Sequence, residues 1–187
     1  AASPIRVIVT GATGMVGEGV LHECLHSPEV DSVLVVTRKT TGTSHPKLKE
    51  LLLPDFFDLS SIKTQLAGYD ACFFCLGVSS LGISKEMYEK LTYRLTLGFA
   101  ELLAAQNPGM VFCYVSGAGT DSTGKSRLHW ARVKGKTEND LQQLPFRAVY
   151  CFRPGMMTPT KGLKNTLPAY KWLGWLLPLM RTVSPNS

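Results

Sequence analysis

The feature that most restricts the fold is a short β-branched run that leads directly into closely spaced glycines. Ile5 to Thr10 reads Ile-Arg-Val-Ile-Val-Thr, which is typical of a buried strand. Gly11 follows at once, and from Met15 the apolar residues are spaced as on one face of a helix that stops before Pro28. The pattern therefore predicts a strand that turns tightly into a helix.

The same alternation continues along the chain. Apolar runs predict five more strands, at residues 32–37, 48–53, 69–76, 110–116 and 146–152. Further helices are expected at residues 84–106 and 128–144. Strands that are apolar throughout are typical of a parallel sheet covered on both faces. We therefore predict a doubly wound α/β (Rossmann) fold of three layers, as a single domain over residues 1–187.

Composition agrees with a globular domain and argues against several other classes. Of the 187 residues, 44% are hydrophobic and 18% are charged. This is too apolar for a disordered chain and too polar for a membrane protein. The net charge is +6, but no basic run is longer than Arg38-Lys39, which argues against a nucleic-acid-binding arm.

Five cysteines form no disulfide framework. Cys72 and Cys75 have the C-x-x-C spacing, but positions i and i+3 of a strand point to opposite faces of the sheet. No metal site is therefore predicted. Free thiols in apolar runs, together with the absence of a signal peptide, predict a cytoplasmic protein.

The turn after the first strand has the spacing G-x-x-G-x-x-G, formed by Gly11, Gly14 and Gly17 around Thr13, Met15 and Val16. Gly11 permits a tight turn, Gly14 lets a pyrophosphate approach the backbone, and Gly17 lets the helix pack closely. The helix N-terminus then offers free N–H groups to phosphates. The alternative is that the glycines serve the turn alone.

The end of the second strand favours one dinucleotide over another. An acid at this point binds the ribose hydroxyls of NAD, whereas a cation suits the 2′-phosphate of NADP. The chain has Arg38 and Lys39 there and no acid until Glu50. A planar guanidinium can bind a phosphate and also stack on adenine. We therefore expect NADP rather than NAD, the alternative for Arg38 being a solvated strand end.

Two further strand ends carry candidate cofactor contacts. Asp58 and Leu59 follow the third strand, where a carboxylate could meet the adenine amino group or simply cap a turn. Leu76 and Gly77 end the fourth strand, beside the expected ribose and nicotinamide.

Taken in order, these motifs resemble the short-chain dehydrogenase/reductase superfamily. The matching segments are Thr10–Gly17, Cys75–Gly77, Val115–Ala118 and Arg153-Pro154-Gly155. The segment Trp130–Glu138 is similar to the atypical branch of Tat-interacting-protein-like and epimerase-like proteins. The resemblance implies a dinucleotide cofactor, NADP in that branch, with Arg153, Pro154 and Gly155 beside it.

The resemblance also implies a catalytic group made of a serine after the fifth strand and Tyr-x-x-x-Lys on the next helix. Ser116 matches the serine and Lys134 the lysine, but the tyrosine position holds Trp130. An indole N–H donates a hydrogen bond but cannot exchange a proton near neutral pH. Lys134 without the tyrosine still suits a clamp on the nicotinamide ribose.

Because Trp130 stands at the position of the catalytic tyrosine, we consider two functions. The first is an NADP-dependent oxidoreductase or epimerase-like enzyme acting on a small carbonyl or sugar-nucleotide substrate. The second is a non-catalytic module that senses NADP(H) for a protein partner. The chain is also expected to lack, or to hold only part of, the C-terminal substrate-binding portion of such enzymes.

The last part of the sequence has a different pattern. Within residues 168–180, apolar side chains recur at helical spacing, namely Trp172, Trp175, Leu176, Leu179 and Met180. The stretch contains Pro178 and is too short to span a bilayer. We expect an amphipathic helix that packs over the domain or forms an interface with a partner or a second copy.

Overall fold

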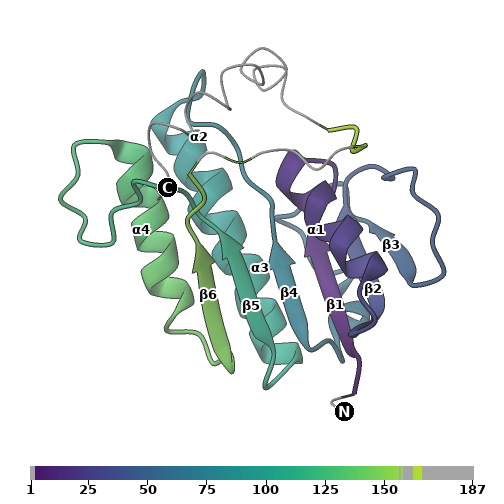
Figure 1. The fold of residues 1–187 in the computed structure, drawn as a ribbon. Helices are drawn as coiled ribbons and strands as arrows, with labels where there is room; N and C mark the ends of the chain where they lie inside the picture. The colour runs from purple at the N-terminus through teal and green to yellow at the C-terminus, as the bar shows by residue number, and fades with distance from the viewer. Residues whose placement is uncertain (1–2, 156, 158–161, 166–187) are drawn as a thin grey trace, which may run out of the picture.

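The computed structural model describes residues 3–155, 157 and 162–165. Within them, six strands form one parallel sheet in the order β3-β2-β1-β4-β5-β6 (Figure 1). The strands are β1 (Ile5–Thr10), β2 (Val30–Thr37), β3 (Leu48–Leu52), β4 (Ala71–Phe74), β5 (Val111–Val115) and β6 (Ala148–Phe152). The order reverses between β1 and β4, and ligands of such sheets bind beyond the carboxyl ends of the strands at that point.

Helices lie on both faces of the sheet, so the predicted three-layer α/β fold is confirmed. They are α1 (Met15–His26), α2 (Lys85–Glu89), α3 (Leu95–Gln106) and α4 (His129–Leu141), with a short 3-10 turn η1 (Lys63–Leu66). The predicted helix over residues 84–106 begins where the Ser84 hydroxyl accepts a hydrogen bond from the Met87 N–H at 3.1 Å. Its middle part, η2 (Lys90–Arg94), is π-helical.

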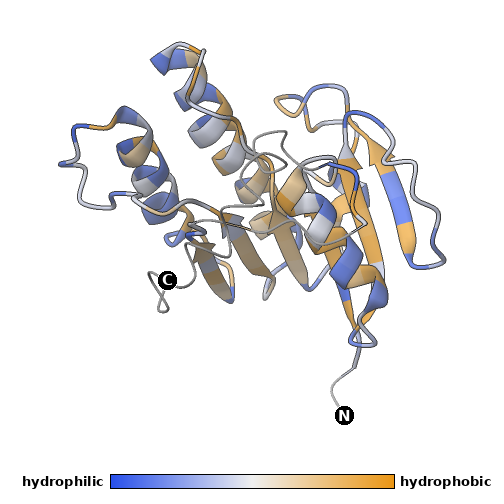
Figure 2. Ribbon diagram, turned by 45° about the horizontal axis from the view of Figure 1, so that its top comes forward, coloured by the Kyte–Doolittle hydropathy of each residue, from blue (hydrophilic) through white to orange (hydrophobic). Residues whose placement is uncertain are grey.

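Strand residues alternate between two hydrophobic clusters because successive side chains point to opposite faces. On one face, Val7 and Val9 pack with Val33, Val35 and α1. On the other, residues such as Ile8, Phe74 and Phe112 pack against α3. Figure 2 shows the resulting hydrophobic colour along the strands. The sheet is therefore an apolar layer between helices.

Cysteine placement follows the same alternation. Cys72 lies within β4 and is fully buried, whereas Cys75 follows the strand and is half-buried. All five cysteines are free thiols. Burial raises the pKa of the Cys24 thiol to about 11 and that of Cys75 to about 12, so these thiols stay protonated and act as small apolar side chains.

The amphipathic helix predicted at residues 168–180 lies outside the described residues. Among the residues that the structure describes, none of the helices has the length and apolar character needed to cross a bilayer.

Two helical glycines differ sharply in the space around them. A Cβ added at Gly135 in α4 would lie 1.9 Å from the carbonyl oxygen of Asp121, so this helix packs directly on the backbone of the loop between β5 and α4. A Cβ added at Gly98 in α3 would meet nothing within 4 Å.

The pair makes a matched test of helix packing. Gly98→Ala should raise the free energy of unfolding by about 0.5–1 kcal/mol, because alanine restricts the unfolded chain and favours the helix. Gly135→Ala gains the same helical preference, but the clash should outweigh it and lower stability by about 1–3 kcal/mol. Urea unfolding followed by circular dichroism measures both, and equal effects would contradict the packing described.

Candidate functional site

The glycine-rich turn brings three backbone segments into close contact. Gly11 has a φ of +69°, and a Cβ there would lie 2.6 Å from the carbonyl carbon of Cys75 at the end of β4. A Cβ on Gly17 would lie 2.1 Å from the carbonyl oxygen of Gly11. Gly11 thus permits the turn, as predicted, and Gly17 lets α1 pack directly against the backbone of this turn.

Gly14 occupies the N-cap of α1 and remains open on its outer side. Its N–H donates to the Gly11 carbonyl at 2.9 Å, and a Cβ there would meet only that same oxygen, at 3.4 Å. Glycine has no side chain to cap the helix, so the N–H groups of Met15 and Val16 in the first turn are not capped by it. This end of the helix suits an anion.

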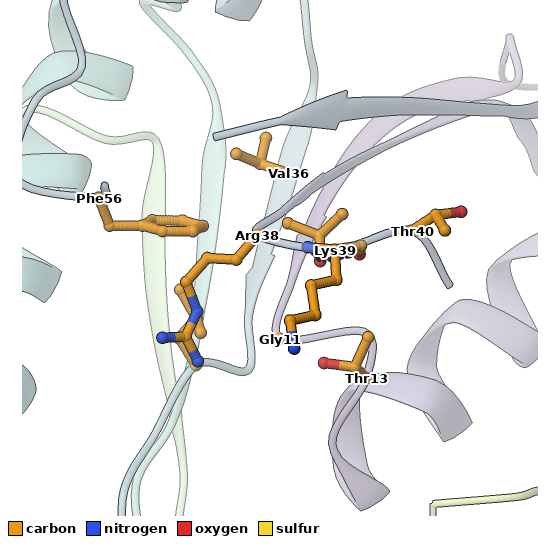
Figure 3. Close-up of a pocket in the computed structure, with 9 residues that line it drawn as sticks. Gly11, Thr13, Val36, Arg38, Lys39, Thr40 and Phe56 are labelled. Atoms are coloured by element: carbon orange, nitrogen blue, oxygen red, sulfur yellow. Dashed lines mark hydrogen bonds between the residues drawn. The ribbon is translucent and has the colours of Figure 1, made fainter. Parts of the chain in front are cut away.

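A cavity of about 390 Å³ lies beside this turn. Gly11 and Thr13 line one wall, and Arg38, Lys39 and Thr40 line another. Figure 3 shows Lys39 extending toward Gly11 and Thr13, with Arg38 on the side of Phe56. The cavity therefore joins the glycine-rich turn to the two cations after β2.

The backbone beyond β2 is held so that these cations face the cavity. The buried Thr37 hydroxyl donates to the Lys39 carbonyl at 2.7 Å, which tightens the turn. Neither Arg38 nor Lys39 forms an ion pair with any described residue. Both charges are therefore available to an anionic group.

A second cavity of about 210 Å³ adjoins the first, with Arg38, Phe56 and Leu76 common to both. Its other lining residues are mostly apolar and come from the segment after β3, the segment after β4 and the helix that contains η2. They are Pro54, Asp55, Phe57, Gly77, Val78, Leu91 and Leu95. This space suits a flat aromatic group beside a guanidinium.

The carboxylates near β2 and β3 have other partners. Glu50 accepts hydrogen bonds from the hydroxyls of Thr40 and Thr41 and from the Thr41 N–H, at 2.5–2.8 Å. Partial burial acts to raise the pKa of Glu50, but the hydrogen bonds have the larger combined effect. The pKa of Glu50 is therefore below its usual value. Asp58 accepts from the Ser60 N–H and hydroxyl in a local turn, which lowers its pKa.

Asp58 and Leu59 line neither of these two cavities. The preceding residues Asp55, Phe56 and Phe57 line the second cavity instead. Leu59 instead packs on the core. The lining aromatics have no distinctive spacing in the sequence, and no motif predicts them.

Ser116 and Lys134 approach the same end of β5. Lys134 Nζ lies 3.4 Å from the carbonyl oxygen of Val115, the residue before Ser116, and 5.4 Å from the centre of the Tyr114 ring. Burial lowers the pKa of the Lys134 ammonium, and the carboxylate of Glu138 partly offsets this.

The Ser116 hydroxyl has a defined neighbour. Its Oγ lies 3.0 Å from Thr120 Oγ1, and the Thr120 hydroxyl donates to the Gly117 carbonyl at 2.7 Å. The single hydroxyl hydrogen of Thr120 is used on Gly117, and Ser116 also hydrogen-bonds the Glu138 carboxyl and helps to lower its pKa. The Ser116 hydroxyl therefore lies within reach of both Thr120 and Glu138.

Trp130 lies one helical turn before Lys134, and the rim of its indole packs on Gly119: a Cβ there would lie 3.3 Å from the ring. Tyr114 is fully buried, and burial raises the pKa of its hydroxyl strongly. Tyr114 therefore does not replace the phenol that Trp130 lacks.

Arg153 is held by an ion pair rather than directed at either cavity. Its guanidinium binds the carboxylate of Glu138, with Nε 3.0 Å from Oε1, and also donates to the Ser122 hydroxyl at 2.6 Å. The Glu138 side chain is 3% exposed and that of Arg153 is 43% exposed. The pair ties the end of β6 to α4 and to the β5–α4 loop.

That loop is otherwise held by Asp121, which accepts from the Ser126 N–H at 2.6 Å and from Thr123. The hydrogen bonds lower the pKa of Asp121 to about 2. Pro154 continues from Arg153, and its carbonyl accepts from the Ala118 N–H at 2.9 Å. Pro154 and Gly155 thus lie beside the loop that follows Ser116.

Sequence reasoning did not identify Glu138 as an important residue. Burial raises the pKa of its carboxyl, but the hydrogen bonds and charge of Arg153 outweigh this and lower the pKa from its usual 4.5. A lone glutamate one turn after a lysine carries no signal in a single sequence, because its partner is fifteen residues away.

Glu138→Gln should lower the free energy of unfolding at about pH 7 by about 1–2 kcal/mol, since the charged hydrogen bonds are lost while Arg153 remains half exposed. Because the pKa of Glu138 is lower in the folded state, the stabilisation is present above its usual pKa and is lost as the pH falls through the folded value. The difference from wild type should therefore shrink below about pH 4.5. Urea titrations over this range measure it.

Lys136→Gln is the matched control, because it removes a surface pair with Asp140 at 2.8 Å. Such pairs contribute about 0.3–0.5 kcal/mol. A loss from Glu138→Gln no larger than this would show that the Arg153 pair does not stabilise the fold.

Known proteins resemble this chain in sequence and in structure. "Protein FMP52, mitochondrial" of Candida albicans is 29% identical over 171 residues, which cover 87% of this chain and 73% of the relative. The chain spans 65% and 66% of the length of two further curated relatives.

Two solved structures show the same fold. A short chain dehydrogenase from Burkholderia cenocepacia in complex with NADP has a TM-score of 0.66 at 15% identity, covering 89% of this chain and 78% of that one. A UDP-glucuronic acid 4-epimerase from Bacillus cereus in complex with NAD has a TM-score of 0.62 at 12% identity, covering 81% and 56%. The two hold different dinucleotides and do not separate NADP from NAD.

The cytoplasmic prediction is wrong by this comparison, because the relatives are named as mitochondrial. The prediction rested on reduced thiols and on the absence of a signal peptide. Buried thiols are protected by the fold itself, so they do not distinguish one compartment from another.

The predicted resemblance to the short-chain dehydrogenase/reductase superfamily is confirmed. Residues 7–127, more than half of the chain, match the family model described as the NAD dependent epimerase/dehydratase family. The chain belongs to the NAD dependent epimerase/dehydratase family.

Proposed function

We propose that this protein binds NADP(H) across the two adjoining cavities. The observation that carries the proposal is that Arg38 and Lys39, without ion-pair partners among the described residues, line the same cavity as Gly11 and Thr13. A 2′-phosphate needs cations at the end of β2, and a pyrophosphate needs glycine and free N–H groups at the start of α1.

The residues present fit such a cofactor. The open side of Gly14 and the first N–H groups of α1 would hold the pyrophosphate. Arg38 and Lys39 would hold the 2′-phosphate, and the cavity lined by Phe56, Phe57 and Leu95 would take the adenine. Leu76 and Gly77, with Pro154 and Gly155, would lie along the ribose and nicotinamide, with Lys134 as a clamp on the ribose.

The reaction that we propose is oxidoreduction, or an epimerase-like reaction that includes such a step, on a small carbonyl or sugar-nucleotide substrate. The nicotinamide would supply or accept hydride. Ser116, whose Oγ lies 3.0 Å from Thr120 Oγ1, would orient the substrate oxygen. The Lys134 ammonium would hold the ribose and add positive charge to the site, and Trp130 would position the substrate without exchanging a proton.

The second candidate is a module that binds NADP(H) without turnover and reports its redox state to a protein partner. Trp130 favours this candidate, because Tyr114 is buried with a raised pKa and does not replace the missing phenol. In either case the names of the relatives support a mitochondrial location for this protein.

Arg38→Ala should weaken NADP binding about 10–100-fold and leave NAD binding nearly unchanged, because a hydrogen-bonded charge contributes about 1.5–3 kcal/mol. Calorimetric titration of the two dinucleotides with wild type and variant measures the preference. The salt dependence of NADP binding should fall as well, since one phosphate contact is lost.

Arg147→Ala is the matched control, because Arg147 is an exposed arginine at the amino end of β6, the opposite edge of the sheet. It should leave both affinities unchanged. If wild type binds neither dinucleotide, the proposed function fails; if it binds NAD at least as well as NADP, the assignment of Arg38 fails.

Trp130→Tyr separates the two candidates. A phenol four residues before Lys134 should speed NADPH-dependent reduction of a carbonyl panel by about 10²-fold or more over wild type, the usual contribution of a general acid. Trp130→Phe is the control, since it removes the indole without supplying a proton. Equal rates in the two variants would favour the sensing module.

A further inference from the structure

Two of the four histidines of the chain stand on α1 in the pattern H-E-x-x-H. The segment is His22-Glu23-Cys24-Leu25-His26. Residues four apart lie one above the other on the same face of a helix. The two imidazole rings are stacked, with their centroids 4.3 Å apart and their planes at 30°. At this spacing a helix can present two imidazoles to one metal ion. The expectation of no metal site rested on the cysteines alone.

The packing of α1 on the sheet fixes this histidine pair on the outer face of the helix. Leu21, Cys24 and Leu25 are buried in the core between α1 and the strands. His26 is exposed and His22 is half-buried, so both rings can be reached from solvent. His26 also lies in the last turn of α1, where the helix dipole favours a positive charge. The pair is therefore accessible to a cation.

The hydrogen bonds of the two rings determine which nitrogen of each is free. Nδ1 of His26 lies 2.7 Å from the carbonyl oxygen of His22, which can only accept, so Nδ1 carries the hydrogen. Nδ1 of His22 lies 3.4 Å from a carboxylate oxygen of Glu23 and is a donor for the same reason. Each neutral ring therefore keeps its lone pair on Nε2. Histidines that bind metals commonly donate their other N–H to a carbonyl or a carboxylate in this way.

A third histidine lies nearby but is held differently. The ring of His45, from the segment between β2 and β3, has its centroid 6.3 Å from that of His26. Its Nδ1 accepts from the Lys47 N–H at 3.2 Å, so in the neutral ring the hydrogen is on Nε2. Within the part of the chain that the structure describes, no three His, Cys, Asp or Glu side chains are arranged to hold one metal ion. The site therefore has two protein ligands, His22 and His26.

We propose that His22 and His26 bind a divalent transition-metal ion through their Nε2 atoms, with water in the remaining coordination positions. Imidazole nitrogens suit Ni²⁺, Cu²⁺ and Zn²⁺, whereas Mg²⁺ prefers oxygen ligands. Glu23 is a positioning residue that orients the His22 ring through Nδ1. A catalytic zinc site uses three protein ligands, so we propose binding and not hydrolysis. The site lies at the last turns of α1, away from the glycine-rich turn at its start, and does not depend on the dinucleotide.

Calorimetric titration of the tag-free full chain with Ni²⁺ at about pH 7.5, where imidazole is mostly neutral, tests the assignment. Ni²⁺ is the probe because it does not oxidise the free thiols. His22→Asn and His26→Asn should each weaken binding by at least about 10-fold, the loss that even an outer partner of a metal ligand causes. His129→Asn is the matched control, because that ring lies on α4 beside Tyr88. It should leave the affinity unchanged, and Mg²⁺ should not bind at this site.

Two further variants test the roles of the neighbouring side chains. Glu23→Ala should weaken Ni²⁺ binding, and Glu23→Gln should restore most of it, because an amide oxygen can still accept from Nδ1 of His22. His45→Asn should leave the affinity nearly unchanged. The proposal is overturned if the wild type does not bind Ni²⁺, or if His22→Asn and His26→Asn bind it as well as His129→Asn does. A loss from His45→Asn as large as that from His26→Asn would overturn the two-histidine assignment.

Discussion

The close backbone contact at the first turn is the constraint on which the rest of the structure depends. Gly11 contacts the backbone at the end of β4, and Gly17 contacts the backbone of Gly11. The turn after β1, the helix α1 and the end of β4 can come this close only because neither glycine has a side chain. No flexible side chain lies at either contact that could move aside. A methyl group at Gly17 would separate α1 from the turn and displace the N–H groups of the first turn of the helix.

Charge determines what this turn can hold. The turn itself suits any phosphate, whereas Arg38 and Lys39 add cations at a second point, and the nearest carboxylate of β3, Glu50, is occupied by Thr40 and Thr41. The edge of the cavity is therefore cationic without a compensating acid at the end of β2. This arrangement supports the proposal of NADP.

The other half of the site is organised by a different interaction. Glu138 and Arg153 join α4, β6 and the β5–α4 loop, and Gly135 lets α4 lie on the backbone of that same loop. Ser116 and Lys134 are thereby brought to one end of β5. These contacts hold the framework around the expected catalytic position, and the position itself holds Trp130. Such a framework around an indole is compatible with positioning as well as with turnover.

Periodicity and β-branched runs depend on neighbouring residues, so the strands, the helices and their parallel arrangement could be predicted from the sequence. It also placed the glycine turn and the two cations after β2, since strand ends are local features. The folded structure was needed to show that Arg153 forms an ion pair with Glu138 and that Phe56 and Phe57, rather than Asp58, line the second cavity. The structure also shows that the side chains of Tyr150 and Phe152 are exposed to solvent. These contacts join segments that are far apart in the sequence, and the local pattern of one segment does not predict which other segment it contacts.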